Sequence, residues 1–279
     1  GDKTIPIPTL IACGLGNMQG HQKISIPFYD TLYTSLKIGK EHDYQLIVYV
    51  GYLYHEEQID IIKNLIIEYR EIIAKVIVDP VCGDNNRPYI DKSIIDNFHK
   101  LFEIADYLIP NETELRILMD YDFNTNISSL INQFICRYPH VNLIVKSIAL
   151  NNTYYNYCIT EKDHNKIPFN KVNANFSGTG DLFAALFIKH AFLNEEQVKI
   201  AISKTAAYLS KLIAYNVYFD KESYDLSILN SFSTTQTKGS LFYVVGPSGV
   251  GKDTLIDLAK KQLKNSNVIF AQRYITRDK

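Results

Sequence analysis

Short apolar runs alternate with amphipathic segments between residues 46 and 160, and this alternation restricts the possible folds more than any other feature of the chain. Leu46–Val50 is a continuous apolar run, which is typical of a strand buried on both faces of a parallel sheet. Between Glu56 and Ile73 the apolar residues recur at helical spacing, and a second apolar run, 75–78, follows. Strands joined by helices in this order predict an α/β fold with a doubly wound, mostly parallel sheet.

The rest of the chain extends this pattern on both sides. Further strands are predicted at 107–109 and 141–145, a more exposed, antiparallel strand at 154–160, and a short strand at 5–12. Helices are predicted at about 91–104, 126–137, 181–192 and 195–214. The pattern fades in a Ser/Thr-rich stretch at 231–239, which is typical of a linker.

Polar side chains gather where the predicted strands end. In a doubly wound sheet ligands bind beyond the carboxyl ends of the strands, so these residues are candidates for one shared site. Each of them taken singly is also an ordinary cap or turn residue. The residues are Asp79, Asp84, Asn111, Glu114, Lys146 and Ser147.

A glycine-containing loop leads into the predicted helix at 181–192. Gly178 and Gly180 flank Thr179, and Asp181 follows immediately. The first turn of a helix leaves N–H groups unpaired, and together with the helix dipole they form an anion site that glycines let a ligand approach closely. Asp181 is therefore placed either to cap the helix or to take a proton from a hydroxyl that attacks a phosphate.

Composition excludes several classes of protein. The chain has 279 residues and is 46% hydrophobic and 21% charged, as expected for a globular protein. The chain contains no run of 18 apolar residues, so we expect no membrane span. The four cysteines are not spaced as metal ligands or as redox pairs, and we therefore expect a cytoplasmic protein. Residues 231–279 carry a net charge of +5, but without interleaved aromatic residues, and we expect no nucleic-acid binding.

Residues 1–229 resemble the pyridoxal kinases of the ribokinase-like superfamily. The resemblance depends on several motifs in the family's order: Gly51-Tyr52-Leu53, the segment from Asp79 to Asp84 with Tyr89 after it, residues 106–115, and residues 176–187. It implies that ATP phosphorylates the 5′-hydroxymethyl group of pyridoxal, in vitamin B6 salvage.

The resemblance also implies roles for individual residues. Asp181 would be the catalytic base, and Gly178, Thr179 and Gly180 would stabilise the charge on the transferred phosphoryl group. Asp79 and Glu114 would hold Mg²⁺. The implied ATP-binding residues are Asp79, Asn111, Glu114, Lys146 and Ser147, and the implied substrate-binding residues are Thr9, Asn17, His21 and Tyr52.

Two departures accompany the resemblance. Many members carry Thr-Ser where this chain has Lys146-Ser147, and the loop at 13–21 differs from the usual one. The family's first strand is expected to precede residue 1, so the sequence is expected to be a window of a longer protein. Related kinases are commonly dimers, which implies a homodimer; whether a monovalent cation takes part stays open.

The C-terminal residues carry a second phosphate-binding motif. A strand-like run from Ser240 to Val245 precedes a P-loop and a predicted helix. This unit resembles the start of a ribose 1,5-bisphosphate phosphokinase, a relative of guanylate kinase, with Arg273 and Arg277 towards the acceptor. The P-loop residues are Gly246, Ser248, Gly249, Gly251, Lys252, Asp253 and Thr254, with Asp253 where Ser or Thr is usual.

The predicted organisation is therefore a kinase-like domain at 1–229, a linker at 230–239 and an incomplete P-loop unit at 240–279. Two alternatives remain open. A hydroxymethylpyrimidine kinase would share the glycine-loop chemistry, and a non-catalytic module would bind nucleotide without transferring phosphate.

Overall fold

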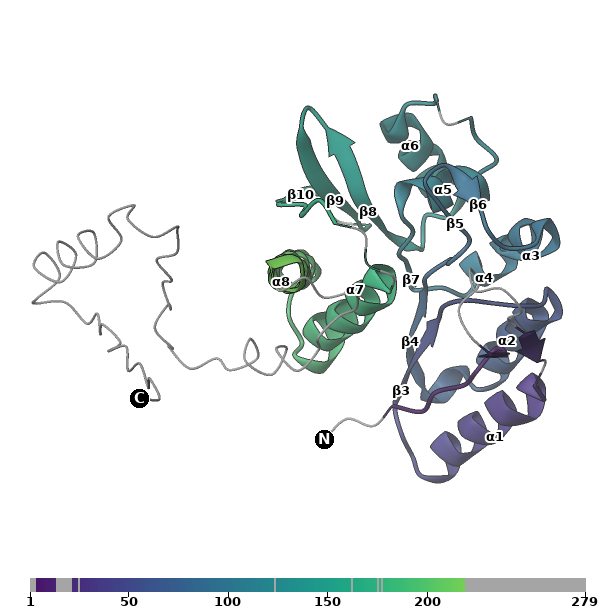
Figure 1. Ribbon diagram of the computed structural model, residues 1–279. Helices are drawn as coiled ribbons and strands as arrows, with labels where there is room; N and C mark the ends of the chain where they lie inside the picture. The colour runs from purple at the N-terminus through teal and green to yellow at the C-terminus, as the bar shows by residue number, and fades with distance from the viewer. Residues whose placement is uncertain are drawn as a thin grey trace, which may run out of the picture. The chain divides into compact units, whose positions relative to one another are not determined.

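The computed structural model describes most of the first 218 residues (Figure 1). The described residues are 4–13, 22–24, 26–122, 124–161, 163–174, 176 and 178–218. Asn17, His21, the linker and all of the P-loop residues lie outside these ranges, so the predictions made for them stay predictions.

A six-stranded sheet organises the described residues. Its order is β10-β9-β8-β7-β4-β3, and β3, β4, β7 and β8 run parallel while β9 and β10 pair antiparallel. This arrangement confirms the predicted doubly wound, mostly parallel α/β fold. The strands are β3 (Leu46–Val50), β4 (Ile73–Val78), β7 (Tyr107–Leu108), β8 (Asn142–Leu150), β9 (Thr153–Ile159) and β10 (His164–Phe169).

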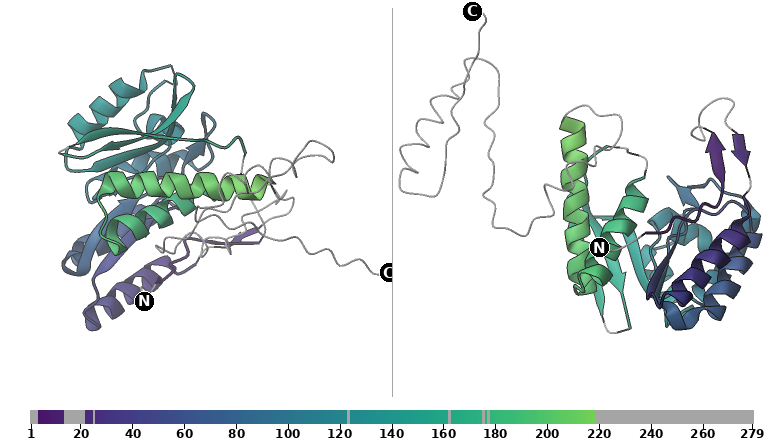
Figure 2. Two further views of the ribbon diagram at one scale, coloured as in Figure 1. Left: turned by 90° about the vertical axis from the view of Figure 1, so that its left-hand side faces the viewer. Right: turned by 90° about the horizontal axis from the view of Figure 1, so that it is seen from below.

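Helices cover both faces of this sheet (Figure 2). On one face lie α1 (Phe28–Glu41), α2 (Glu57–Glu68), α3 (Lys92–Asn97), α4 (His99–Phe102), α5 (Glu112–Leu118) and α6 (Ile127–Arg137). On the other lie α7 (Thr179–Ile188), a π-helical turn (Lys189–Leu193) and α8 (Val198–Tyr218).

The central parallel strands carry apolar side chains on both faces because helices cover both faces of the sheet there. In β4, Val76 and Val78 pack with α1–α6, whereas Ile77 between them packs with α7 and α8. In β8, Ile144 faces the α7–α8 side and its neighbour Val145 faces the other. Each fully buried aliphatic side chain of this kind contributes about 1.5–3 kcal/mol, which fixes the sheet between its helices.

Two short antiparallel pairs lie outside the main sheet. Strand β1 (Ile11–Cys13) pairs with β2 (Gln22–Ile24), and β5 (Gly83–Asp84) pairs with β6 (Arg87–Pro88). Asn85 and Asn86, both at positive φ, make the turn between β5 and β6, as asparagines do in tight hairpins. Gly83 admits no side chain, because a Cβ there would lie 2.4 Å from Ile117 and 2.8 Å from the Arg87 carbonyl oxygen.

Several predicted boundaries were wrong. The strand expected at 5–12 is confined to residues 11–13, since Pro6 and Pro8 have no N–H to give to a ladder. The helix expected up to Ile73 ends at Glu68, and Ile73 starts β4 after a 3₁₀ turn, Arg70–Ile72. The helix expected at 91–104 is broken at Phe98, and α7 passes into a π turn after Ile188.

Candidate functional site

The sheet brings three of the predicted polar clusters to one edge. Asp79 follows β4 directly, and its N–H donates to the Val50 carbonyl at the end of β3 (2.8 Å). Lys146 in β8 donates its N–H to the Pro110 carbonyl (2.8 Å), and Asn111 and Lys146 form a parallel bridge. Backbone pairing at the carboxyl ends of the strands therefore places Asp79, Asn111 and Lys146 side by side.

Lys146 and Asp79 form a buried ion pair. The Lys146 Nζ lies 2.8 Å from one Asp79 carboxylate oxygen and 3.1 Å from the other. Their side chains are only 9% and 1% exposed. Burial acts to lower the pKa of Lys146, but the charges of Asp79 and Glu114 outweigh it and raise the pKa. Burial raises the pKa of Asp79 against the pull of Lys146.

The glycine loop closes onto this pair. Gly178 is the N-cap of α7 at φ +81°, a left-handed conformation that glycine adopts without strain. The Thr179 hydroxyl donates to the Phe176 carbonyl (2.7 Å), which fixes the turn. A Cβ on Gly180 would lie 3.6 Å from the Lys146 Nζ, so the ammonium group lies at the start of α7. A helix N-terminus and a lysine together favour an anion there.

Asp181 and Tyr49 complete the cluster. Asp181 lies in the first turn of α7 and is exposed. The Tyr49 hydroxyl lies 3.4 Å from Asp79 Oδ2 and 3.4 Å from Asp181 Oδ1. Burial and the charges of Asp79 and Asp181 raise the pKa of Tyr49, so the hydroxyl stays protonated and serves as a donor.

Sequence reasoning did not find Tyr49, which was assigned only to a buried strand. The available signal was a hydroxyl-bearing side chain in an otherwise aliphatic run, one residue before the strand ends.

Asn111 and Glu114 form a reciprocal capping box at the start of α5. The Asn111 side chain accepts from the Glu114 N–H (2.8 Å), and the Glu114 carboxylate accepts from the Asn111 N–H (2.7 Å). The Asn111 amide also donates to the Gly83 carbonyl (3.0 Å). Glu114 is 3% exposed, and burial raises its pKa to about 8 although Lys146 acts against that rise.

Ser147, Tyr52 and Thr9 were also predicted to belong to the site. Ser147 is exposed at φ +60°, and its N–H donates to the buried Asn156 side chain (3.0 Å). Tyr52, half-buried, follows the end of β3. The Thr9 carbonyl accepts from Gln58 Nε2 (2.8 Å). Thr9 lines a separate hollow of about 570 Å³ whose lining includes neither Asp79 nor Asp181.

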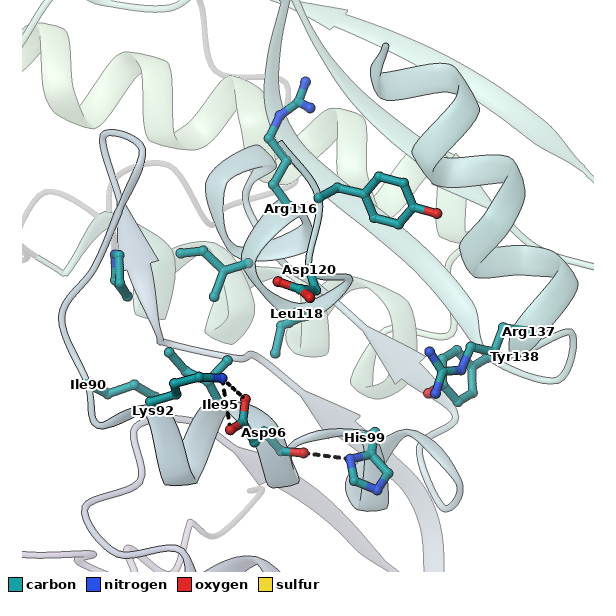
Figure 3. Close-up of a pocket in the computed structure, with 13 residues that line it drawn as sticks. Ile90, Lys92, Ile95, Asp96, His99, Arg116, Leu118, Asp120, Arg137 and Tyr138 are labelled. Carbon is teal, nitrogen blue, oxygen red and sulfur yellow. Dashed lines mark hydrogen bonds and ion pairs between the residues drawn. The ribbon is translucent and has the colours of Figure 1, made fainter. Parts of the chain in front are cut away.

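A second hollow, of about 500 Å³, is shown in Figure 3. It contains none of the predicted site residues, and several of its polar groups have local partners. Lys92 pairs with Asp96 at 2.7 Å, the His99 ring contacts the Asp96 carbonyl, and Arg116 pairs with Glu112 at 2.7 Å.

The characteristic sequence pattern of the phosphomethylpyrimidine kinases matches residues 37–227 of the chain. The chain belongs to the phosphomethylpyrimidine kinase family. Among the described residues of this family member, no helix is long and apolar enough to cross a membrane.

Relatives of this family member with solved structures share its fold. A phosphomethylpyrimidine kinase-like protein from Bacteroides thetaiotaomicron, crystallised with pyridoxal, is 21% identical with a TM-score of 0.70, covering 85% of this chain and 87% of that one. The pyridoxal kinase of Entamoeba histolytica is 17% identical with a TM-score of 0.71 and covers 85% of this chain and 87% of its own.

Curated sequences match over shorter stretches. A pyridoxal kinase-like protein of Schizosaccharomyces pombe is 32% identical over 127 residues, which are 41% of this chain and 39% of that protein. The ribose 1,5-bisphosphate phosphokinase of Psychromonas ingrahamii is 58% identical over 41 residues, 15% of this chain and 21% of that protein. The chain thus spans about half or less of the length of curated relatives such as these.

Proposed function

We propose that residues 1–229 transfer the γ-phosphoryl group of ATP to the 5′-hydroxymethyl group of pyridoxal. The observation that carries this proposal is the joint position of Asp181, the Gly178–Gly180 loop and the Lys146 ammonium group at one sheet edge. A base, an anion site and a cation are what phosphoryl transfer to a hydroxyl requires. The pyridoxal in the crystals of the Bacteroides relative and the name of the Schizosaccharomyces relative support the acceptor.

In this reaction Asp181 accepts the proton of the substrate hydroxyl as it attacks phosphorus. The N–H groups at the start of α7 and the Lys146 ammonium then face the charge that develops on the transferred group. The Tyr49 hydroxyl, within reach of Asp181, orients that carboxylate. Gly178 and Gly180 let the phosphates approach the backbone, since neither carries a side chain.

Mg²⁺ fits the oxygen donors at this edge. Within the described part of the chain no three His, Cys, Asp or Glu side chains group as a metal centre, but Mg²⁺ in kinases needs only one or two carboxylates together with phosphate oxygens. Asp79 and Glu114 would hold the ion, with Asn111 fixing Glu114 through the capping box. Bound Mg²⁺ would neutralise phosphate charge.

The family match favours a pyrimidine as a second acceptor, because the matching sequence pattern is that of phosphomethylpyrimidine kinases, and hydroxymethylpyrimidine is the unphosphorylated compound of that class. Both acceptors present a hydroxymethyl group on an aromatic ring to the same base. Tyr52, Thr9, Asn17 and His21 are proposed to contact the ring. Turnover measured with each acceptor at equal concentration tests the choice, and faster turnover on the pyrimidine would overturn the pyridoxal assignment.

We also propose that the kinase-like domain ends at residue 229, that residues 230–239 form a linker, and that the P-loop unit begins at residue 240. The 41-residue match to a ribose 1,5-bisphosphate phosphokinase supports a P-loop nucleotide-kinase origin for residues 240–279. Lys252 would contact the phosphates there. A Lys252→Ala variant that keeps pyridoxal turnover while losing a second nucleotide-binding event would support two separate sites, and loss of turnover would contradict them.

A further inference from the structure

The site holds several carboxyl groups and one buried cation, Lys146. The carboxylates of Asp79 and Asp181 and the carboxyl group of Glu114 all act on Lys146. Lys146 is itself buried, and its ammonium group contacts both oxygens of Asp79. A buried carboxylate without a partner is costly, so a cation at this position is needed for Asp79 to remain charged.

We propose that Lys146 is a tethered cation, which occupies the place where a free monovalent cation would otherwise balance Asp79, so that the site works without such an ion. The inference rests on the proposed function for the role of the site, whereas the ion pair on which it is built stands independently. The proposal also gives Lys146 a role beyond contact with the phosphates.

The position of the ammonium group supports this assignment. It lies between the Asp79 carboxylate at the end of β4 and Gly180 at the start of α7, 3.6 Å from where a Cβ on Gly180 would be. A lysine ammonium is a compact charge with three donors. Two N–H directions serve the Asp79 oxygens, and one remains for an anion at the helix N-terminus.

The backbone holds the ammonium group in this place. Lys146 is anchored in β8 by its N–H bond to Pro110 and by the bridge to Asn111. A tethered charge needs no recruitment from solution and is present at any salt composition. A lysine that only stabilised the fold through this ion pair would have the same geometry. The effect of removing the side chain therefore distinguishes a structural lysine from a tethered cation.

The test compares melting temperatures in KCl, NaCl and tetramethylammonium chloride at equal ionic strength. We expect wild type and the surface control Lys204→Ala, whose lysine pairs with Glu196 at 2.7 Å, to melt equally in all three salts. Lys146→Ala should melt lower in tetramethylammonium chloride and recover in KCl or NaCl by roughly 5–10 °C, the shift that a ligand at about 100 times its Kd produces. Tetramethylammonium is the matched control because it is too large to fill the vacated place.

Removing the carboxylate as well supplies a second variant. Lys146→Ala combined with Asp79→Asn should fold in every salt and show no response to KCl. If Lys146→Ala shows no salt-specific recovery, or stays unfolded in KCl while the double variant folds, the proposal is overturned. If the melting temperature of the wild-type protein depends on KCl, the proposal is overturned whatever the variants show. This wild-type measurement decides the matter if neither variant folds.

Turnover provides an independent readout. If wild type releases ADP, its rate should be the same in all three salts, and the rate of Lys146→Ala should rise in KCl. If wild type releases no ADP in any salt, the proposed function fails, while the melting experiment still decides the role of Lys146.

Discussion

Replacing Glu114 by glutamine should make the protein more stable at neutral pH. The Glu114 side chain is 3% exposed, and burial raises its pKa from 4.5 to about 8. The folded protein therefore binds this proton more tightly than the unfolded chain, and the free energy of unfolding falls as the pH rises from about 4.5 towards 8. Each pH unit in that window costs about 1.4 kcal/mol, so roughly 3 kcal/mol is lost between pH 5 and pH 7.

Glutamine has no such proton to lose, but it retains an oxygen that accepts from the Asn111 N–H in the capping box. Urea denaturation of both proteins from pH 4.5 to pH 9 measures the difference. We expect the two stabilities to converge near pH 4.5, and Glu114→Gln to be more stable by about 3 kcal/mol at pH 7.

The surface variant Glu103→Gln is the matched control. Glu103 pairs with Lys63 and is 53% exposed, so its removal should change stability by less than about 1 kcal/mol. If Glu114→Gln is less stable than wild type throughout, with a parallel pH profile, then Glu114 is ionised in the folded state and the argument from burial is wrong.

Four further substitutions probe the start of α7 and its neighbours. Gly178→Ala should lose about 1–2 kcal/mol of stability because φ is +81°, whereas Gly180→Ala, whose Cβ would make only an ordinary contact, should gain up to about 1 kcal/mol; equal effects in urea denaturation would contradict this. Tyr49→Phe removes the hydroxyl that orients the Asp181 carboxylate and should lower kcat for pyridoxal phosphorylation; an unchanged kcat would exclude the contact from the reaction. Thr179→Val should lose about 1 kcal/mol by removing the hydroxyl bond to Phe176, and an unchanged melting temperature would show that the bond is dispensable.

The sheet could be predicted from the sequence because its cause is local. In Ile73–Val78, for example, Val76 and Val78 pack against one layer of helices and Ile77 packs against the other, and a largely apolar run is the direct result. The boundaries of helices depend on packing instead. Nothing in the sequence at 189–193 distinguishes a π turn from a continued α-helix, and the break at Phe98 puts a fully buried ring between two short helices.

Part of the candidate site could be predicted from the sequence for a similar reason. Asp79 and Asn111 were found because residues after parallel strands share one edge, which is a rule of topology. Lys146 was expected after its strand but lies within β8, where it pairs with Asn111 at the same edge. The side chains that these residues contact could not be predicted in this way. Lys146 and Asp79 are 67 residues apart, and Tyr49 and Asp181 are 132 apart, so only the folded chain shows that these side chains meet.

The catalytic role of Asp181 is tested most directly by ADP release from Mg-ATP, with and without pyridoxal, by wild type and Asp181→Asn. We predict pyridoxal-dependent release by wild type, about 10²–10⁴-fold slower in the variant, while nucleotide binding measured by calorimetry is retained. Equal release by both proteins would contradict the assignment of the base. Nucleotide binding without release by wild type would contradict the kinase proposal and leave a module that only binds nucleotide.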